Sequence, residues 1–331
     1  ILLHTGQHYD FGMSESFFEE LGIPAPAFNL GIGGGGQGQM TGRQLEQIEA
    51  ILDETRPDCV LVYGDTNSTL AGALAAAKLH VPVAHVEAGL RSGNKRMPEE
   101  INRILTDHVS AFLFTPTLAA NQNLAKEGLA QSVYFVGDIM YDAAKTFAVD
   151  LQSDGSPLFS ELALTNKRYR VATVHRQENV DDQERLGIIL SALRSLAKEM
   201  PLILPIHPRL RKTLEHSKRG AEMLKGITVI DPVGFKDMIA LLREASLVIT
   251  DSGGLQKEAY FHGTPAIVLR EETEWTELTD LGWALLAPPI STDHILVSAR
   301  KIEGTTGDEK AQPYGAGDTA ARIMQILKDN L

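Results

Sequence analysis

Short apolar segments alternate with longer segments of helical spacing along most of the chain. Each apolar segment has the length of a strand, and alternating strands and helices form parallel sheets covered by helices on both faces. The pattern therefore predicts an α/β protein. In the first half, the expected strands are residues 1–4, 59–63, 81–86, 111–115 and 133–136. In the second half, they are residues 170–174, 202–206, 227–230, 247–250 and 266–269.

The two series of strands predict two doubly wound, Rossmann-like domains. Residues 150–167 are weakly patterned and contain Ser153-Asp-Gly-Ser-Pro157, so we interpret them as the connection. The predicted domains are residues 1–149 and 150–317, followed by a C-terminal segment, 318–331, with a helix over 318–328. The chain lacks an initiator Met and already reads as a strand at residue 1. We therefore expect the first domain to be truncated at its N-terminus.

Net charge, the length of apolar runs and the cysteine count limit the kinds of partner and cellular location that we expect. The 331 residues carry a net charge of −12, which disfavours nucleic acid and anionic membranes as partners. No apolar stretch approaches the ~18–20 residues that span a bilayer, and no signal peptide is visible. Cys59 is the only cysteine, so a disulfide framework is excluded. We expect a cytoplasmic protein.

Polar signatures follow the strands of both halves. They are Gly64-Asp65-Thr66, Glu87-Ala-Gly89, His175-Arg176, His207-Pro-Arg209, Asp231-Pro-Val233-Gly234 and Ser252-Gly253-Gly254. Ligands of open α/β sheets bind outside the carboxyl ends of the strands. The six signatures therefore predict two sheets whose carboxyl edges face one cleft.

The Ser252-Gly253-Gly254 turn joins an apolar strand to a helix-compatible segment. Unpaired N–H groups at a helix start attract phosphate, and glycines let it approach closely. Glu258 lies about one helical turn further on, where its carboxylate could accept hydrogen bonds from a ribose diol. The combination indicates a nucleoside diphosphate. The alternative is a plain tight turn with a solvated glutamate.

Three carboxylates of the first half could surround one sugar ring. Asp65 alone could merely cap a helix, and Glu87 could be a buried residue satisfied by backbone donors. Glu99 follows Pro98 in a predicted first helical turn, where acidic residues are common without any chemistry. His175-Arg176 could stabilise a departing phosphate, whereas His207 is at least as well explained as a structural histidine.

Several longer segments carry a family resemblance. They are Thr5-Gly-Gln-His8, Val62-Tyr-Gly-Asp65-Thr-Asn67, His85-Val-Glu87-Ala-Gly-Leu-Arg91, Pro98-Glu-Glu-Ile-Asn-Arg103, Thr173-Val-His175-Arg176, Asp231-Pro232 and Thr250-Asp-Ser-Gly-Gly-Leu-Gln-Lys-Glu258. Together they resemble the non-hydrolysing UDP-N-acetylglucosamine 2-epimerases. The resemblance implies a glycosyltransferase B (GT-B) type fold of two domains, a C-terminal helix that returns to the first domain, and a homodimer.

The resemblance also implies roles for individual residues. Asp65, Glu87 and Glu99 match the catalytic carboxylates, and His175 would face the phosphates. Ser252, Gly253 and Gly254 would hold the pyrophosphate, Glu258 the ribose and Val233 the uracil. The sugar would lie near Arg103, His207, Arg209, Arg270 and Trp275. The implied reaction eliminates UDP and adds it back through a glycal, and it requires neither a metal nor a redox cofactor.

Two departures from the family pattern bear on activity and substrate. The family's Gly-x-Arg-Pro-Glu loop is absent, and Trp275 stands where an Arg followed by Pro is usual. Thr273-Glu-Trp275 resembles the branch acting on UDP-2,3-diacetamido-2,3-dideoxyglucuronate, which makes a sugar for surface polysaccharide. Arg209 and Arg270 could then bind the additional carboxylate, while Trp275 could alternatively serve packing alone.

The sequence thus favours UDP-2,3-diacetamido-2,3-dideoxyglucuronate as substrate, with UDP-N-acetylglucosamine second. Two other classes stay open. A GT-B glycosyltransferase would share the Ser-Gly-Gly nucleotide site, and a catalytically inactive UDP-sugar-binding protein would keep the site without the reaction.

Overall fold

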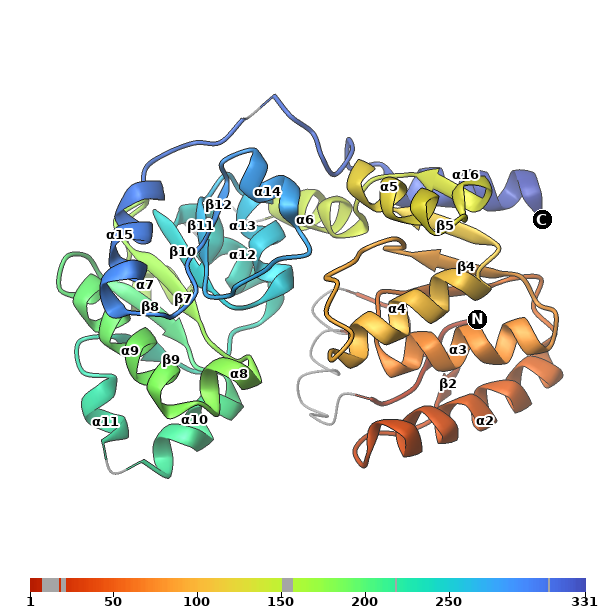
Figure 1. The fold of residues 1–331 in the computed structure, drawn as a ribbon, viewed down its shortest axis with the longest axis horizontal. Coiled ribbons are helices and arrows are strands. Elements are labelled where there is room, and N and C mark those ends of the chain that lie inside the picture. The colour runs from red at the N-terminus through yellow and green to blue at the C-terminus, as the bar shows by residue number, and fades with distance from the viewer. Residues whose placement is uncertain (8–17, 19–21, 151–156, 218, 309) are drawn as a thin grey trace. The chain divides into compact units, whose positions relative to one another are not determined.

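The computed structural model describes residues 1–7, 18, 22–150, 157–217, 219–308 and 310–331. The chain separates into two compact units (Figure 1). The first unit comprises residues 1–143 and 312–331, and the second comprises residues 144–311. Each contains a parallel sheet with helical connections. The predicted α/β class with two Rossmann-like domains is confirmed.

The first unit contains a four-stranded parallel sheet and a separate parallel pair of strands. The sheet has the order β3 (Val60–Tyr63), β4 (Val83–Val86), β5 (Phe112–Thr115) and β6 (Val133–Phe135), and the pair joins β1 (Leu3–His4) to β2 (Phe28–Asn29). The associated helical segments are α2 (Gln37–Thr55), α3 (Asn67–Lys78), α4 (Pro98–Val109), α5 (Leu118–Lys126), η1 (Ala130–Ser132), α6 (Ile139–Asp150), which crosses into the second unit, and α16 (Thr319–Asn330).

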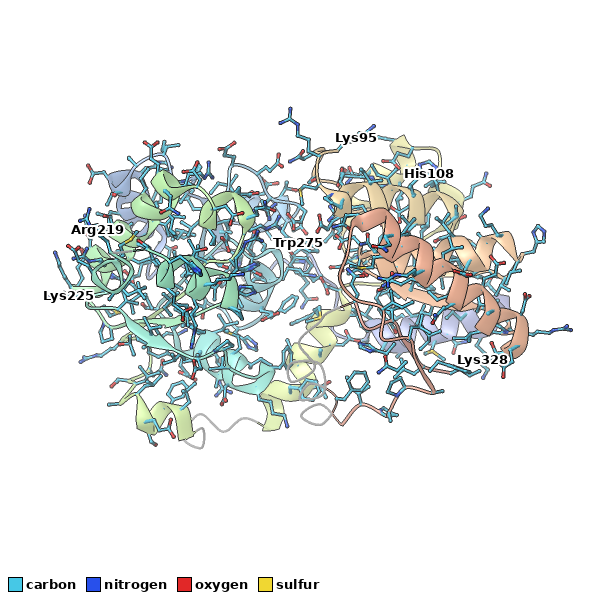
Figure 2. The ribbon with its side chains drawn as sticks, turned by 90° about the horizontal axis from the view of Figure 1, so that it is seen from below. Lys95, His108, Arg219, Lys225, Trp275 and Lys328 are labelled. Carbon is cyan, nitrogen blue, oxygen red and sulfur yellow. The ribbon has the colours of Figure 1, made fainter. Side chains whose placement is uncertain are left out.

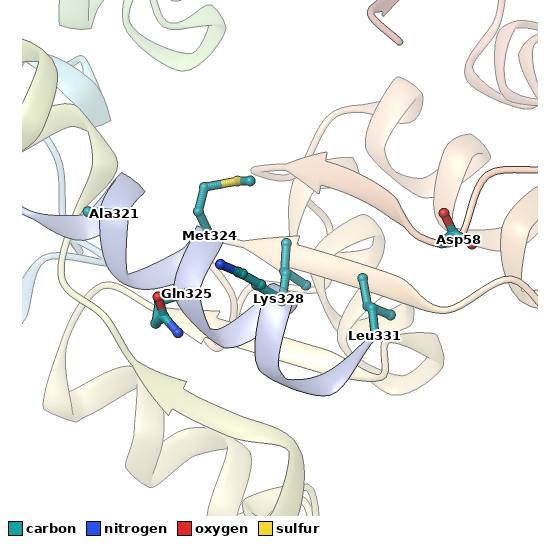
Figure 3. Close-up of a pocket in the computed structure, with 7 residues that line it drawn as sticks. Asp58, Ala321, Met324, Gln325, Lys328 and Leu331 are labelled. Carbon is teal, nitrogen blue, oxygen red and sulfur yellow. The ribbon is translucent and has the colours of Figure 1, made fainter.

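Small and apolar side chains decide how these helices cover the sheet. Ala71 and Ala75 of α3 are fully buried with Val62 and Val83, and alanines allow α3 to approach both the sheet and α2 closely. Ile323 of α16 packs in the cluster that contains the alternate sheet positions Ala84, Val86, Phe112 and Phe114. Residues of α16, together with Asp58 and Leu331, line a pocket (Figure 3).

The second unit contains a six-stranded parallel sheet of the order β12-β11-β10-β7-β8-β9. Its strands are β7 (Arg170–Thr173), β8 (Leu202–Pro205), β9 (Thr228–Ile230), β10 (Leu247–Thr250), β11 (Ala266–Val268) and β12 (Ala284–Leu286). Counted from β7, this is the 3-2-1-4-5-6 order of dinucleotide-binding domains, with its topological switch point between β7 and β10. Its helices are α7 (Pro157–Glu161), α8 (Gln177–Val180), α9 (Gln183–Ala197), α10 (Pro208–Glu215), α11 (Gly220–Met223), α12 (Phe235–Glu244), α13 (Gly253–Phe261), α14 (Thr276–Asp280) and α15 (Thr292–Ile302).

The structure contains all ten predicted strands, and most are shorter by one or two residues at an end. Sequence reasoning missed β2 and β12, which are short and lie beside proline-rich stretches. The interpretation of residues 150–167 as a plain connection is wrong for α7 and the residues after it. Leu158, Phe159 and Leu164 pack against the buried Tyr169, so this segment belongs to the core of the second unit.

Two kinds of feature are absent from the residues that the structure describes. Among these residues, no helix combines the length and the apolar character that a bilayer crossing needs. Within the same ranges, no group of three or more His, Cys, Asp or Glu side chains is placed to hold a metal ion.

His262, in the turn after α13, predicts an acid sensitivity of the second unit. Burial lowers the pKa of its imidazole from 6.5 to about 4, and Arg243 and Lys167 add to this effect. Because the unfolded chain takes up the proton first, stability present above about pH 6.5 is lost as the pH falls toward 4. We expect His262 to account for a fall of about 2–3 kcal/mol in the free energy of unfolding across this window.

Urea unfolding of wild type and His262→Gln at neutral and acidic pH measures this contribution. The variant should lose less stability than wild type on acidification. His216→Gln, which removes an exposed histidine at the end of α10, is the control. An equal loss in wild type and His262→Gln would contradict the assignment.

Candidate active site

Asp65 lies in the turn between β3 and α3, after Gly64 in a left-handed conformation (φ 63°). Its carboxylate pairs with the guanidinium of Arg103, whose side chain is almost fully buried. The Asn102 amide donates to the Asp65 carbonyl oxygen at 3.0 Å. Thr66, not Asp65, caps α3, because its hydroxyl accepts from the Thr69 N–H. The reading of Asp65 as a helix cap is therefore wrong.

Glu87 lies directly after β4, beside the Asp65 turn. Its carboxylate oxygen Oε2 is 3.4 Å from the position that a β-carbon on Gly64 would occupy. Its backbone has φ 73°, a conformation that costs a residue other than glycine about 1–3 kcal/mol. Its N–H donates to the Phe114 carbonyl oxygen at 3.1 Å, which holds the strained residue against β5. Adjacent strand ends thus bring the turns carrying Asp65 and Glu87 together.

The adjacent residues Glu99 and Glu100 have opposite environments in the first turn of α4. Glu99 is exposed, whereas Glu100 is 1% exposed. The Glu100 carboxylate accepts from the N–H groups of Ser92 and Gly93, at 3.0 and 2.9 Å, and from Arg103 at 3.0 Å. Glu100 therefore fixes the loop before α4 and orients the guanidinium that pairs with Asp65. The Glu100–Arg103 spacing of three residues is the sequence signal that could have predicted this pair.

In the second unit, the turns after β7 and β10 meet at the switch point. Asp251 is fully buried and accepts from the N–H groups of His175 and Arg176, both at 3.0 Å. The Asp251 carboxylate therefore connects the turn after β7 to the turn after β10. It was not predicted from sequence, although Asp251 stands directly before the Ser-Gly-Gly turn.

The start of α13 has the features of an anion site. Ser252 is the N-cap, and no acidic residue lies in the first turn. Gly254 is exposed, and a β-carbon there would be 3.8 Å from Glu258 Oε1, which places Glu258 beside the same end of the helix. A β-carbon on Gly253 would lie 2.5 Å from the Glu274 carboxylate, so a side chain at this position would require Glu274 to move. The exposed N–H groups and the helix dipole favour a bound anion.

His175 and His207 face each other with ring centroids 5.2 Å apart. Burial lowers the pKa of both imidazoles, and His175 lowers that of His207 further. His207 Nδ1 accepts from the Arg209 N–H at 3.1 Å and caps α10. Arg209 itself forms a half-exposed ion pair with Asp181.

Two of the residues expected near the sugar in the second unit, Arg270 and Trp275, are buried. Trp275, labelled in Figure 2, is 3% exposed, with Lys257 Nζ 3.9 Å from its ring centroid. Arg270 is also 3% exposed and donates to Glu274 at 2.9 Å. Burial opposes ionisation of Glu274, but Arg270, Arg176 and a backbone hydrogen bond together lower the pKa of the carboxyl. The geometry favours packing by Trp275 and orientation of Glu274 by Arg270.

Val233 is half-buried against the cluster of Tyr169 and Leu241, just before Gly234 caps α12. The structure thus groups Asp65, Glu87 and Arg103 in the first unit, whereas Glu99 is exposed in the first turn of α4. In the second unit, it groups His175 with His207, and Ser252, Gly253 and Gly254 with Glu258.

The sequence profile of the family described as UDP-N-acetylglucosamine 2-epimerase matches residues 1–328. The UDP-2,3-diacetamido-2,3-dideoxy-D-glucuronate 2-epimerase of Pseudomonas aeruginosa is 51% identical over 331 residues, covering 99% of this chain and 90% of that protein. The UDP-N-acetylglucosamine 2-epimerase of Methanocaldococcus jannaschii is 40% identical over 332 residues, covering 98% of this chain and 90% of that protein.

Solved structures agree with the sequence comparison. The crystal structure of the M. jannaschii UDP-GlcNAc 2-epimerase in complex with UDP-GlcNAc and UDP superposes with a TM-score of 0.89 at 38% identity, covering 99% of this chain and 91% of that one. The Neisseria meningitidis UDP-GlcNAc 2-epimerase bound to UDP-GlcNAc has a TM-score of 0.85 at 28% identity, with 98% and 90% covered. The resemblance seen in the sequence motifs is thereby confirmed, and the chain belongs to the UDP-N-acetylglucosamine 2-epimerase family of isomerases.

Proposed function

We propose that this isomerase inverts C2 of UDP-2,3-diacetamido-2,3-dideoxyglucuronate by eliminating UDP and adding it back. The observation that carries the proposal is the pair of carboxylate turns at neighbouring strand ends. Glu87 is held there in a strained backbone conformation, and Asp65 is held by a buried Arg103. Strain retained at such a position is typical of functional residues.

The chemistry needs carboxylates in this arrangement. No carbonyl acidifies the C2 hydrogen of the sugar, so its direct removal would leave an unstabilised carbanion. If a carboxylate takes the C2 proton while the C1–O bond to UDP breaks, the electrons form the C1–C2 double bond of a glycal. UDP then adds back to C1, and an acid delivers a proton to the opposite face of C2. Asp65, Glu87 and Glu99 are the proposed acids and bases.

The second unit is proposed to hold the nucleotide. The switch point between β7 and β10 is where ligands bind in sheets of this order. Ser252, Gly253 and Gly254 would bind the diphosphate, Glu258 the ribose and Val233 the uracil. His175 has a lowered pKa, which favours a neutral imidazole that donates one hydrogen bond to the departing UDP. For the reaction, the carboxylates of the first unit must act on the sugar of this bound UDP-sugar.

The choice of sugar rests on the relatives and on one segment. The 51% identical relative is named for the diacetamido-glucuronate sugar, and Thr273-Glu274-Trp275 matches that branch. UDP-N-acetylglucosamine is the second candidate, because the 40% identical relative is named for it. With Arg270 turned to Glu274, Arg209 is the proposed contact of the additional sugar carboxylate. We also propose that the protein is a cytoplasmic homodimer.

Incubation with each UDP-sugar in heavy water tests the function. We expect deuterium to enter C2 and the C2 configuration to invert with UDP-2,3-diacetamido-2,3-dideoxyglucuronate, as followed by proton NMR. Turnover of UDP-N-acetylglucosamine alone would reject the preferred sugar. Transfer of the sugar without C2 exchange would identify a glycosyltransferase, and tight UDP binding with no exchange would identify a binding protein.

A further inference from the structure

His85 lies in the middle of β4 and is fully buried. Its ring nitrogen Nε2 is 2.8 Å from the carbonyl oxygen of Gly64, and Nδ1 is 2.7 Å from Asp107 Oδ1. A backbone carbonyl can only accept a hydrogen bond, so Nε2 must carry a hydrogen. The state of the ring then depends on whether Nδ1 or Asp107 carries the proton between them.

The surroundings of Asp107 favour an ionised carboxylate. Asp107 is fully buried, and its second oxygen, Oδ2, accepts from the Gly89 N–H at 3.1 Å and from Arg91 Nη1 at 2.7 Å. Two donors, one of them a guanidinium, stabilise negative charge on this group. The proton therefore belongs on Nδ1, which makes His85 an imidazolium.

The charges around this buried pair balance. Arg91 bridges Asp107 to Glu127 with an Nη2–Oε2 distance of 2.7 Å, and His108, labelled in Figure 2, faces Glu127 at 3.3 Å. Two cations, His85 and Arg91, thus oppose two anions, Asp107 and Glu127. The desolvation cost of a buried imidazolium is offset in this cluster, because its charge is paired and both of its N–H groups donate hydrogen bonds.

The two hydrogen bonds of His85 lead to both carboxylate turns. One ends on Gly64, the residue before Asp65, and the other passes through Asp107 to Gly89, two residues after Glu87. We propose that His85 is a positioning residue that carries a hydrogen on both ring nitrogens and connects the Asp65 and Glu87 turns. The catalytic role of those carboxylates rests on the proposed function, whereas the protonation of His85 does not.

Nitrogen NMR of the histidine-labelled protein tests the protonation directly. At neutral pH, both ring nitrogens of His85 should show one-bond coupling to hydrogen, with His85→Gln used to assign the signals. A ring with one unprotonated nitrogen would overturn the proposal. This measurement needs no substrate, so it stands even if the enzyme shows no C2 exchange and the proposed function fails.

Two substitutions separate the two bonds. His85→Gln keeps a donor that can reach Gly64, and His85→Asn keeps one that can reach Asp107. We expect each to lower kcat for C2 exchange by about tenfold to a hundredfold, because small misplacements of catalytic groups have effects of this size. KM should change little, since the nucleotide is held by the second unit.

His108→Gln, at the half-exposed end of α4, is the control and should keep kcat near wild type. Thermal melts of all three variants establish that they are folded. A raised KM with unchanged kcat, or full activity in both His85 variants, would reject the positioning role. If either variant fails to fold, the nitrogen NMR result for wild type and the kinetics of the other variant decide.

Discussion

We expect Glu87→Gln to lower the rate of C2 hydrogen exchange by about 10²–10⁴-fold, the usual contribution of a positioned acid or base. The substitution keeps the shape of the side chain but removes the proton-accepting carboxylate. Asp65→Asn should give a comparable loss, because both turns lie at neighbouring strand ends. Deuterium incorporation at C2 measures the reaction, and calorimetric titration with UDP measures binding.

UDP affinity should change little in either variant, because the proposed nucleotide site lies in the second unit. Asp58→Asn is the control: it alters an exposed carboxylate just before β3, away from the Asp65 turn. If both active-site variants lose UDP affinity as strongly as they lose exchange, the carboxylates are binding residues. Exchange at the wild-type rate in Glu87→Gln would exclude Glu87 from the chemistry.

Gly89→Ala should destabilise the first unit by about 3 kcal/mol or more. Gly89 has φ 82°, and a β-carbon there would lie 2.6 Å from the Ala120 carbonyl oxygen and 2.9 Å from the side chain of Leu124. Both contacts come from α5, whose backbone cannot yield without losing its own packing. The strain of the left-handed conformation adds to this overlap.

Gly93→Ala is a matched control for Gly89→Ala. Gly93 has φ 75°, but no atom lies within 4 Å of its β-carbon position. It should cost only the conformational strain, about 1–2 kcal/mol. Urea unfolding followed by circular dichroism compares the two. Equal losses in the free energy of unfolding would mean that α5 shifts to accommodate the added β-carbon. The close contact with Gly89 would then not fix the turn that follows Glu87.

Local patterns predicted most of the fold. Apolar runs located the strands because each buried strand needs a continuous apolar face, and Leu247–Thr250 matches its prediction at both ends. Strand Ala284–Leu286 was missed because its three residues precede Ala287-Pro288-Pro289, which reads as a turn. Helix Pro157–Glu161 was missed because its order comes from packing against Tyr169, a contact that local spacing does not reveal.

The candidate site was predictable in its residue types but not in its supporting contacts. Glu99 and Glu100 carry the same sequence signal, and only the orientation of α4 makes one exposed and the other buried. His85 and Asp107 are 22 residues apart, and their pairing depends on how α4 packs against β4. Asp251 likewise accepts hydrogen bonds from the backbone N–H groups of His175 and Arg176. Because every residue except proline has such a group, the residue types do not reveal these contacts.

The packing of α16 onto the first unit has a consequence during protein synthesis. The apolar side chains Val86, Phe112 and Phe114 are covered by Ile323 and its neighbours, which the ribosome makes only after the entire second unit. Until then, the nascent first unit presents an uncovered apolar sheet face, a surface that chaperones bind and that favours aggregation. The first unit therefore completes its core only after α16 has been synthesised.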